Sequence, residues 1–354
     1  MKIANSIEPE NIFILELLTS TSIEVNKLNI ANYCLSKLQK LKPNDATVLI
    51  NYAYLHLKQG DLKSAKKCFE ESINIEPSNP NTNYGLGLVL SLSSKYLEAI
   101  SYFKKAIALK PEFEIAISEL MKCQSIICDW DGLKNNMEKL EYLGLKNESL
   151  SPFMFLAIED NPLRHLQRAK KFSKNLDREK NKKINSIKNE KIRIGYFSSD
   201  FFDHATMHLM KRIFELHNTS KFEIFIYSYG SHKDDLTLWL KDQVFSFNDI
   251  SELSDPEAAV LARQHNLDIA IDLKGHTFNS RLGIFSYRVS QIQITYLGYP
   301  GTTGLKAMDY IIADKEIINE GEENFYQEKI IKMPFSYQCN DDRKEILDKK
   351  FKRS

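Results

Sequence analysis

The sequence has little of what marks membrane, secreted or nucleic-acid-binding proteins. Its 48 Lys and Arg residues are balanced by 47 Asp and Glu residues, so a net charge of +1 offers no basic excess to displace the counterions of a nucleic acid. No apolar run approaches the length of a transmembrane helix, and the first ten residues, MKIANSIEPE, lack the apolar core of a signal peptide. We therefore expect neither a nucleic-acid partner nor a membrane partner.

Cysteine and the common nucleotide-binding motifs are also scarce. The five cysteines are odd in number and contain no CxxC pair: Cys34, Cys68, Cys123, Cys128 and Cys339. Scattered cysteines of this kind are typical of reduced, structural thiols in a cytoplasmic protein. No GxGxxG motif follows the first predicted strand and no GK[ST] motif occurs, which disfavours NAD and ATP as ligands.

The first third of the chain does contain a repeat, with a period of 34 residues. Phe103 follows Phe69 at this interval, and three prolines and three alanines keep the same spacing: Pro43, Pro77 and Pro111; Ala31, Ala65 and Ala99. The order Ala-x3-Phe followed by Pro is the second-helix half of the tetratricopeptide pattern. In that pattern the alanine lies where two helices approach, the phenylalanine packs into the next repeat, and the proline ends the helix.

This period predicts a tetratricopeptide array over residues 1–127. The clear repeats are 46–79 and 80–113, a degenerate repeat at about 12–45 precedes them, and the first helix of another lies near 114–127. Stacked helical hairpins form a concave groove that binds peptides, so we expect protein or peptide partners there.

Residues 128–190 are predicted to form a helical bridge and a charged linker. We expect a helix from Gly132 to Leu143 with Asp131 as its N-cap, and a second helical piece from Ser151 to Leu166 and beyond. The stretch 170–191 is rich in Lys and Asn and predicts a solvated tether.

Strands and helices alternate in residues 191–354. The predicted strands are 192–197, 222–227, 268–273, 291–297, 310–313 and 329–333, and the predicted helices lie around 207–216, 236–240 and 256–264. Apolar, β-branched strands that alternate with helices imply a parallel sheet covered on both faces, which is a Rossmann-like domain.

Ligands of such a domain gather beyond the carboxyl ends of the strands, where three loops attract attention. These loops are 198–206, 274–281 and 298–304, and their glycines and helix starts favour an anionic group such as a diphosphate. His204 and His208 have the i, i+4 spacing of helical zinc ligands, but the glutamate of an HExxH motif and a third ligand are missing. We therefore expect no metal.

The same loops carry the motifs of a known family. Residues 192–340 resemble the N-terminal lobe of the catalytic region in the protein O-GlcNAc transferase (and SPINDLY-like) family. The matching segments include Ile194-Gly195-Tyr196, Ser198-Ser199-Asp200-Phe201, His204-x-Thr206-x-His208-Leu209, Asp272-Leu273-x-Gly275-His276-Thr277, Tyr296-Leu297-Gly298-Tyr299-Pro300-Gly301-Thr302-x-Gly304 and Met308-Asp309-Tyr310-Ile311-Ile312. Cys128-Asp129-Trp130 matches the family's bridge between repeats and catalytic lobe.

The resemblance implies an α + α/β chain: a tetratricopeptide helical-hairpin array followed by one Rossmann-like lobe of a GT-B glycosyltransferase. It also implies an inverting enzyme that moves N-acetylglucosamine from UDP-GlcNAc to Ser or Thr hydroxyls, without a metal. In this family the repeats guide the protein substrates.

Site residues follow from the matching positions. His204 corresponds to the histidine proposed as the catalytic base, and the alternative is a structural histidine that orients its loop. Asp200 and His208 are expected to support that loop. The donor-binding residues implied by the resemblance are Leu297, Gly298, Tyr299, Pro300, Gly275, His276 and Thr277. The alternatives are a strained strand-to-helix turn for the first four and a structural role for His276.

The resemblance ends before the family's second lobe, which supplies most contacts to UDP. After Asn340 the sequence predicts only one short charged helix, Asp341–Asp348, and a basic end. We therefore expect either a second-lobe polypeptide as a partner or a non-catalytic repeat scaffold with a vestigial lobe. An unpaired lobe is expected to expose apolar residues around Gly298–Gly304. The acceptor protein and the exact donor sugar stay open, because SPINDLY-like relatives use fucose.

Overall fold

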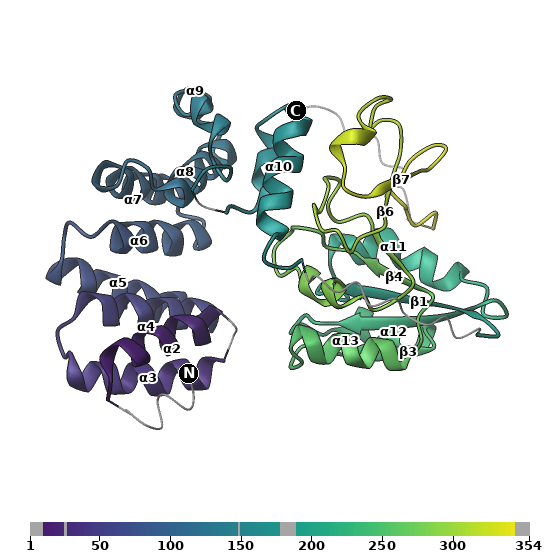
Figure 1. The fold of residues 1–354 in the computed structure, drawn as a ribbon, viewed down its shortest axis with the longest axis horizontal. Helices are drawn as coiled ribbons and strands as arrows, with labels where there is room; N and C mark the ends of the chain where they lie inside the picture. The colour runs from purple at the N-terminus through teal and green to yellow at the C-terminus, as the bar shows by residue number, and fades with distance from the viewer. Residues whose placement is uncertain (1–9, 25–26, 148, 178–188, 344–354) are drawn as a thin grey trace, which may run out of the picture. The chain divides into compact units, whose positions relative to one another are not determined.

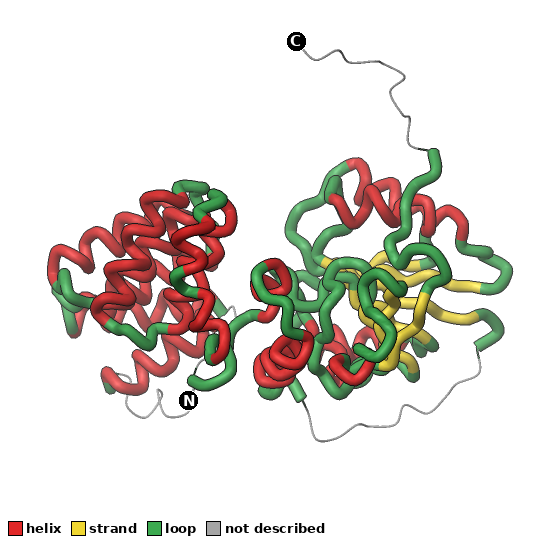
Figure 2. Tube along the Cα trace, turned by 90° about the horizontal axis from the view of Figure 1, so that it is seen from above, coloured by secondary structure: helices red, strands yellow, loops and turns green. Residues whose placement is uncertain are grey.

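The computed structural model describes residues 10–24, 27–147, 149–177 and 189–343, and Figure 1 follows the chain from end to end. The chain divides into two compact units, with the boundary between Leu150 and Ser151. The first unit is helical, whereas the second contains a sheet with helices around it (Figure 2). None of the helices in the described ranges combines the length and the apolar character needed to cross a bilayer.

Stacked helical hairpins build the first unit (Figure 1). Its helices are α2 (Ile12–Glu24), α3 (Leu28–Leu41), α4 (Ala46–Lys58), α5 (Leu62–Ile75), α6 (Pro80–Leu92), α7 (Tyr96–Leu109) and α8 (Glu114–Ile126). Asp45, Asp61 and Asn79 cap the starts of α4, α5 and α6 with their side-chain oxygens. Each of the three periodic prolines lies two residues after the end of α3, α5 or α7, which confirms the predicted period.

The aromatic residues of the repeat pack against glycines. Phe69 and Phe103 are completely buried, as are the periodic alanines. A Cβ atom at Gly85 would lie 2.2 Å from the Phe69 ring, and one at Gly87 would lie 2.6 Å from the Phe103 ring. Because Gly85 belongs to the repeat after that of Phe69, the prediction that this phenylalanine packs into the next repeat is confirmed.

The bridge after α8 differs from the prediction. The expected helix from Gly132 to Leu143 is wrong: the chain forms a short helix α9 (Trp130–Lys134) and then a 3₁₀ helix η1 (Met137–Glu141). The N-cap is Asp129, not Asp131, because the Asp129 carboxylate accepts the Gly132 N–H at 3.0 Å. The side-chain amide of Asn136 donates to the Gly132 carbonyl, which favours a tighter turn over a continuous α-helix.

The second unit begins with two short helices instead of one helical piece. They are the 3₁₀ helix η2 (Pro152–Ala157) and α10 (Pro162–Ser173). Proline at the first position of α10 has no N–H and cannot continue a preceding helix, and Asn161 caps the new one. Most of the predicted tether, residues 178–188, lies outside the described residues.

A parallel sheet of seven strands follows, in the spatial order β3-β2-β1-β4-β5-β6-β7. The strands are β1 (Ile192–Ser198), β2 (Phe222–Ser228), β3 (Ser246–Asp249), β4 (Ile269–Asp272), β5 (Ile292–Thr295), β6 (Tyr310–Ala313) and β7 (Lys329–Lys332). The helices are α11 (Ala205–Leu216), α12 (Asp235–Gln243), α13 (Asp255–Gln264) and the 3₁₀ turns η3 (Leu282–Tyr287) and η4 (Glu323–Phe325). The predicted parallel α/β lobe is confirmed, with one strand, β3, that the sequence pattern did not reveal.

The strand order reverses between β1 and β4. In open α/β sheets ligands bind at such a reversal, beyond the carboxyl ends of the strands. Two apolar cores cover the two faces of the sheet. Neighbouring residues of β1 alternate between them, since Tyr196 packs with Met207 and Met210 of α11 whereas Phe197 packs with residues of α13 and η3.

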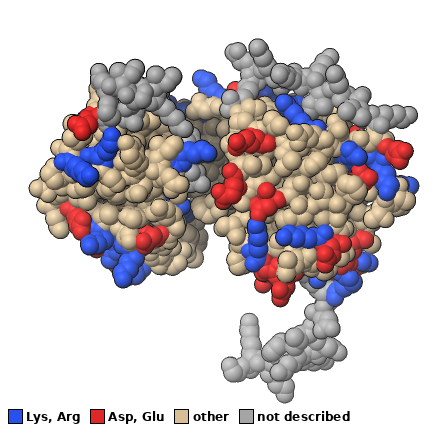
Figure 3. All heavy atoms as spheres, turned by 90° about the horizontal axis from the view of Figure 1, so that it is seen from below, with Lys and Arg blue, Asp and Glu red and all other residues tan. Residues whose placement is uncertain are grey.

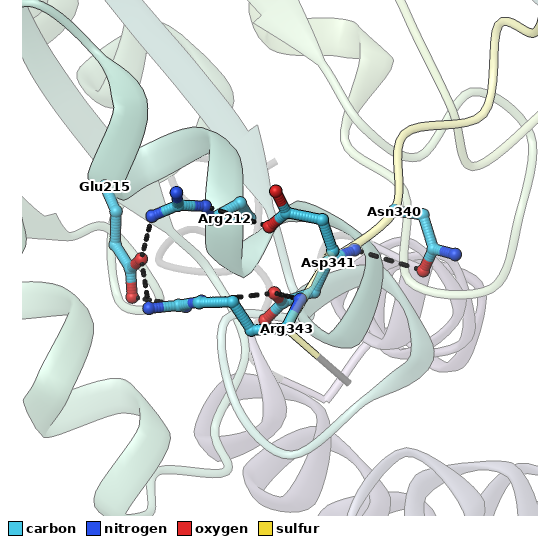
Figure 4. Close-up of polar contacts among 6 residues, drawn as sticks. Arg212, Glu215, Asn340, Asp341 and Arg343 are labelled. Carbon is cyan, nitrogen blue, oxygen red and sulfur yellow. Dashed lines mark hydrogen bonds and ion pairs between the residues drawn. The ribbon is translucent and has the colours of Figure 1, made fainter. Parts of the chain in front are cut away.

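The segment after β7 returns to α11. The Tyr296 hydroxyl donates to the Tyr337 carbonyl at 2.9 Å. Glu215 lies between two guanidinium groups, 3.1 Å from Arg212 and 2.7 Å from Arg343 (Figure 4). These contacts fix the path of the chain as far as Arg343. The rest of the predicted charged helix, residues 344–348, lies outside the described residues.

Charges of both signs are interspersed over the molecular face that Figure 3 shows. No broad field of one sign is seen on that face, in keeping with the balanced composition.

Candidate functional site

Three loops meet at the carboxyl edge of the sheet. They follow β1, β4 and β5, which are neighbours in the sheet and run parallel. The loops after β1 and β4 lie on the two sides of the reversal of strand order, and the loop after β5 follows the next strand of the sheet. The three sequence-predicted loops thus occupy one place in the fold.

A buried ion pair joins the first two loops. Lys274 Nζ lies 2.6 Å from Asp200 Oδ2, and each side chain is only 8% exposed. The Ser199 hydroxyl donates to the other carboxylate oxygen of Asp200 at 2.7 Å. These contacts hold Asp200 in its loop, and Lys274, which occupies an unspecified position of the family motif, is one of its two partners. Lys274 was not predicted as a site residue, because nothing local in the sequence shows that it contacts Asp200, 74 positions away.

His204 stands at the N-terminus of α11 as its N-cap. Its backbone is extended, and its Nδ1 accepts the Thr206 N–H at 3.2 Å. The same Nδ1 lies 3.7 Å from Asp200 Oδ2, and the side chain is 40% exposed. The imidazole is therefore partly exposed, on a loop beside the reversal of strand order.

His208 lies one turn further along α11 and is more exposed. Its Nε2 lies 2.7 Å from Asp203 Oδ1, so it supports the loop between β1 and α11. An open cavity of about 490 Å³ adjoins this pair, lined by Asp203, His208, Lys211, Asp234, Asp235, Leu236 and Trp239. Within the described ranges, no three His, Cys, Asp or Glu residues come together in a way that could hold a metal ion.

Asp272 organises the second loop from within the sheet. Its buried carboxylate accepts the N–H groups of Lys274 at 3.1 Å and Gly275 at 2.7 Å. Burial raises the pKa of this carboxyl to about 6, although those hydrogen bonds act in the opposite direction. The loop of Gly275, His276 and Thr277 is thereby held to the end of β4.

His276 is buried within that loop. Its Nε2 lies 2.8 Å from the Thr303 carbonyl oxygen, and its ring meets those of Tyr299 and Phe172 edge-on. Burial lowers the pKa of the imidazole to about 4, so it is neutral and donates through Nε2. This position fits the structural alternative for His276: the ring ties the second loop to the third.

The third loop starts with an unusual turn. The Gly298 N–H donates to the Tyr296 carbonyl at 2.9 Å, and Leu297 between them has a φ of +68°. This is a γ-turn, a strained conformation for a residue with a side chain. Glycine is required next, because a Cβ at Gly298 would lie 2.1 Å from the Leu273 carbonyl oxygen.

The large side chains of the third loop point inward. Leu297 is 8% exposed, Tyr299 2% and Leu305 0%. The expectation of exposed apolar residues around Gly298–Gly304 is therefore wrong, because Leu297 and Leu305 belong to the two apolar cores and Tyr299 packs on His276. This burial counts against an apolar interface with a partner lobe at this loop. Any contact from Leu297 or Tyr299 to a ligand would involve mainly backbone groups.

A buried carboxylate holds the far end of the third loop. Glu328, just before β7, accepts hydrogen bonds from the Thr302 hydroxyl at 2.7 Å, the Thr303 N–H at 2.8 Å and the Thr303 hydroxyl. Desolvation raises the pKa of Glu328. The Thr303 carbonyl in turn accepts the Ser173 hydroxyl of α10 at 2.7 Å. This support was not predicted, because Glu328 belongs to no motif.

The comparison with protein families agrees with this arrangement. The sequence model of glycosyl transferase family 41 matches residues 166–353, more than half of the chain. The chain belongs to glycosyl transferase family 41. A tetratricopeptide model matches residues 46–79 and 80–113, the two repeats predicted from the period.

Curated relatives in family 41 match the lobe. The chain is 34% identical over 162 residues to the "Probable UDP-N-acetylglucosamine--peptide N-acetylglucosaminyltransferase SEC" of Arabidopsis thaliana, which covers 45% of the chain and 16% of the relative. It is 35% identical over 159 residues to the "UDP-N-acetylglucosamine--peptide N-acetylglucosaminyltransferase" of Caenorhabditis elegans, covering 44% of the chain and 14% of the relative. The matches thus span about one sixth of the length of these relatives.

Among solved structures, a mutant of the Thermobaculum terrenum O-GlcNAc transferase has the same fold. The TM-score is 0.57 at 21% identity, with 92% of this family 41 chain and 58% of the other chain covered. Helical repeats followed by a parallel α/β lobe are therefore shared with a transferase of known structure.

Proposed function

We propose that this chain takes part in protein O-GlcNAcylation, as the repeats and N-terminal lobe of a GT-B glycosyltransferase. The reaction is the transfer of N-acetylglucosamine from UDP-GlcNAc to Ser or Thr hydroxyls of protein segments bound in the repeat groove. The observation that carries this proposal is the arrangement at the sheet edge: in a family 41 lobe, an accessible imidazole stands beside two glycine-containing loops at the reversal of strand order.

Different residues of the three loops have different proposed roles. His204 is the candidate base for the acceptor hydroxyl, and Asp200 and His208 hold its loop. Leu297–Pro300 and Gly275–Thr277 are the candidate donor contacts, mainly through backbone groups, since the side chains of Leu297, Tyr299 and His276 are buried. Donor sugar and acceptor are expected to meet without a metal, and the setting is expected to be cytoplasmic.

The diphosphate needs more than these loops offer. Stabilising the departing diphosphate is a large part of catalysis in such reactions, and the three loops present few cations besides Lys274, which is paired. The proposal therefore includes a second Rossmann-like lobe, in the same protein or in a partner polypeptide.

Calorimetric titration with UDP-GlcNAc tests this function. The purified chain is expected to bind the donor, and His204→Ala to weaken binding by about tenfold through loss of a polar contact. His56→Ala, in the repeat unit, serves as the matched control and is expected to leave binding unchanged. GDP-fucose, titrated in parallel, distinguishes the donor sugars.

A second assay follows transfer of labelled sugar to a Ser- and Thr-containing peptide, with the chain alone and with a separately produced second lobe. Absence of UDP-GlcNAc binding at millimolar concentration would refute a donor site in this lobe. The chain would then be a non-catalytic scaffold that recognises protein segments.

A further inference from the structure

The Nδ1 atom of His204 lies between a hydrogen-bond donor and a hydrogen-bond acceptor. On one side is the Thr206 N–H, a donor, at 3.2 Å. On the other side is Asp200 Oδ2, an acceptor, at 3.7 Å. A ring nitrogen can accept a hydrogen bond or donate one, but it cannot do both at once. The choice of partner for Nδ1 therefore decides where the neutral imidazole carries its proton.

In the structure Nδ1 caps α11, which we term the capping arrangement. Nδ1 accepts the Thr206 N–H there, so the proton of the neutral ring resides on Nε2. An Nε2 that carries a proton can donate a hydrogen bond but cannot remove a proton from a hydroxyl. The capping arrangement is thus unsuited to a base that acts through Nε2.

The opposite arrangement, with the ring rotated, exchanges these partners. If Nδ1 turns toward Asp200, it donates its proton to the carboxylate, and Nε2 becomes an acceptor; we term this the paired arrangement. Asp200 is ready for this role because its loop position is fixed by Lys274 at 2.6 Å and by the Ser199 hydroxyl at 2.7 Å. A charged acceptor forms a stronger hydrogen bond than the Thr206 hydroxyl, which also lies 3.2 Å from Nδ1.

We propose that Asp200, fixed by Lys274, is a positioning residue that draws His204 from the capping into the paired arrangement and so makes it a base. This inference rests on the proposed function for its purpose, since only a sugar transfer requires the base. Asp200 acts through His204 and touches neither the donor nor the acceptor.

In the paired arrangement His204 can accept the proton of the acceptor hydroxyl during sugar transfer. The acceptor hydroxyl oxygen forms a bond to the anomeric carbon of the donor sugar, while the bond from that carbon to the diphosphate oxygen breaks. The nucleoside diphosphate leaves with the bonding electron pair. The hydroxyl proton passes to Nε2, and the resulting imidazolium keeps its Nδ1 proton on Asp200 until solvent takes up the Nε2 proton.

Nitrogen-15 NMR of the full chain tests the pairing without any reaction. Long-range proton–nitrogen correlations distinguish an Nδ1–H from an Nε2–H imidazole, and His204→Gln identifies the resonance among the eight histidines. Spectra at about pH 8 keep ordinary imidazoles neutral. The wild type is expected to populate both tautomers.

The decisive variant removes both charges, Asp200→Asn with Lys274→Met, so that no buried charge is left alone. It is expected to lower the ratio of Nδ1–H to Nε2–H at His204 by about tenfold, the worth of one charge-assisted hydrogen bond. Near-ultraviolet circular dichroism checks that each variant is folded.

Two control variants test whether a change in the tautomer ratio is specific to Asp200. Arg193→Met with Glu223→Gln removes an ion pair at the opposite end of β1 and should leave the tautomers unchanged. Thr206→Val removes the neighbouring hydroxyl but keeps the backbone N–H. A wild-type His204 found only as Nε2–H, an unchanged ratio in the double-charge variant, or a loss of Nδ1–H in Thr206→Val instead would each overturn the pairing.

Sugar transfer provides the second readout. With donor, peptide and second lobe present, the double-charge variant is expected to lower kcat by about 100-fold with little change in the KM for UDP-GlcNAc. An unchanged kcat despite the tautomer shift would refute the catalytic use of the pairing. Failure of the wild type to bind UDP-GlcNAc would refute the proposed function, while the tautomer measurement still decides whether Asp200 controls His204.

Discussion

The repeat unit and the lobe differ in what they bury. Within the described part of the repeat unit, one charged residue is buried, Glu114. The described part of the lobe buries several: Glu159, Arg168, Asp200, Asp272, Lys274, Asp314 and Glu328. Buried charges contribute little net stability compared with apolar residues of similar size. Apolar packing therefore stabilises the repeats. The interior of the lobe also contains charged side chains, and several of their polar contacts hold the loops of the candidate site.

The largest expected effect tests the apolar side of this comparison. Phe69→Ala is expected to lower the free energy of unfolding of the repeat unit by about 3–5 kcal/mol, because it leaves a cavity next to Gly85. Far-ultraviolet circular dichroism during urea unfolding measures it. The control is Leu97→Ala on exposed surface, expected to change nothing. Equal effects of the two substitutions would contradict a repeat unit held by its periodic phenylalanines.

The next effect tests the polar side. Glu328→Ala leaves the donors of Thr302 and Thr303 without their acceptor and is expected to cost the lobe about 3 kcal/mol. Trp239 fluorescence in a Trp130→Phe background reports on the lobe, since the chain has two tryptophans. Glu320→Ala, on an exposed turn, is the control. A loss below that of ordinary surface substitutions would show that the third loop does not depend on Glu328.

The pH dependence of stability should separate the two units. Because the folded lobe lowers the pKa of His276 to about 4 from its usual 6.5, the unfolded chain binds more protons between these values. The contribution of His276 is thus complete above pH 6.5 and is lost as pH falls toward 4, by about 3 kcal/mol. His276→Gln, which keeps a donor for Thr303, is expected to abolish this loss.

The measurement is the difference between wild type and His276→Gln in urea unfolding from pH 4 to pH 7, followed by Trp239 fluorescence. Taking the difference cancels Asp272, whose raised pKa acts in the opposite sense between its usual 3.8 and about 6. The repeat unit in the same samples should show no such difference. A pH-independent difference would mean that His276 is not buried as a neutral ring.

The smallest expected effect concerns the segment after β7. Arg343→Ala removes one of the two guanidinium groups beside Glu215, but the contact is exposed and Arg212 remains (Figure 4). No measurable change in the unfolding of the lobe is expected by Trp239 fluorescence, since exposed ion pairs are weak. An effect as large as that of Glu328→Ala would place this segment among the polar supports of the site.

Local patterns predicted most of the fold. The proline period fixed the repeats, and apolar strands such as β6 (Tyr310–Ala313) were predicted to the residue. β3 was missed because three of its four residues, Ser246, Asn248 and Asp249, are polar, so the strand exists only by pairing with β2. The predicted helix bounds near Asp129 were wrong, because side-chain hydrogen bonds from Gln124 and Asn136 determine where the helix begins and ends.

The candidate site was predictable in its loops but not in its contacts. The motifs placed His204, Gly275 and Gly298 on the correct loops, because strand ends and glycines are visible locally. Nothing local shows that Lys274 reaches Asp200 or that Glu328 reaches Thr303, since such partners are chosen by the sheet order. The burial of Tyr299 could not be predicted from the sequence either, because an aromatic residue in a glycine-containing loop can lie on the surface or in the core.

The Thr303 carbonyl has a consequence for the time course of folding. It is shared by His276, 27 positions earlier, and by Ser173, 130 positions earlier. The nearer contact can form once β4 and β5 are paired, but the farther one requires α10 to dock against a loop 130 positions later in the chain. Because contacts between distant positions form slowly, the third loop should reach its final shape among the last parts of the lobe. A donor pocket built on that loop would therefore appear only when the remainder of the lobe is complete.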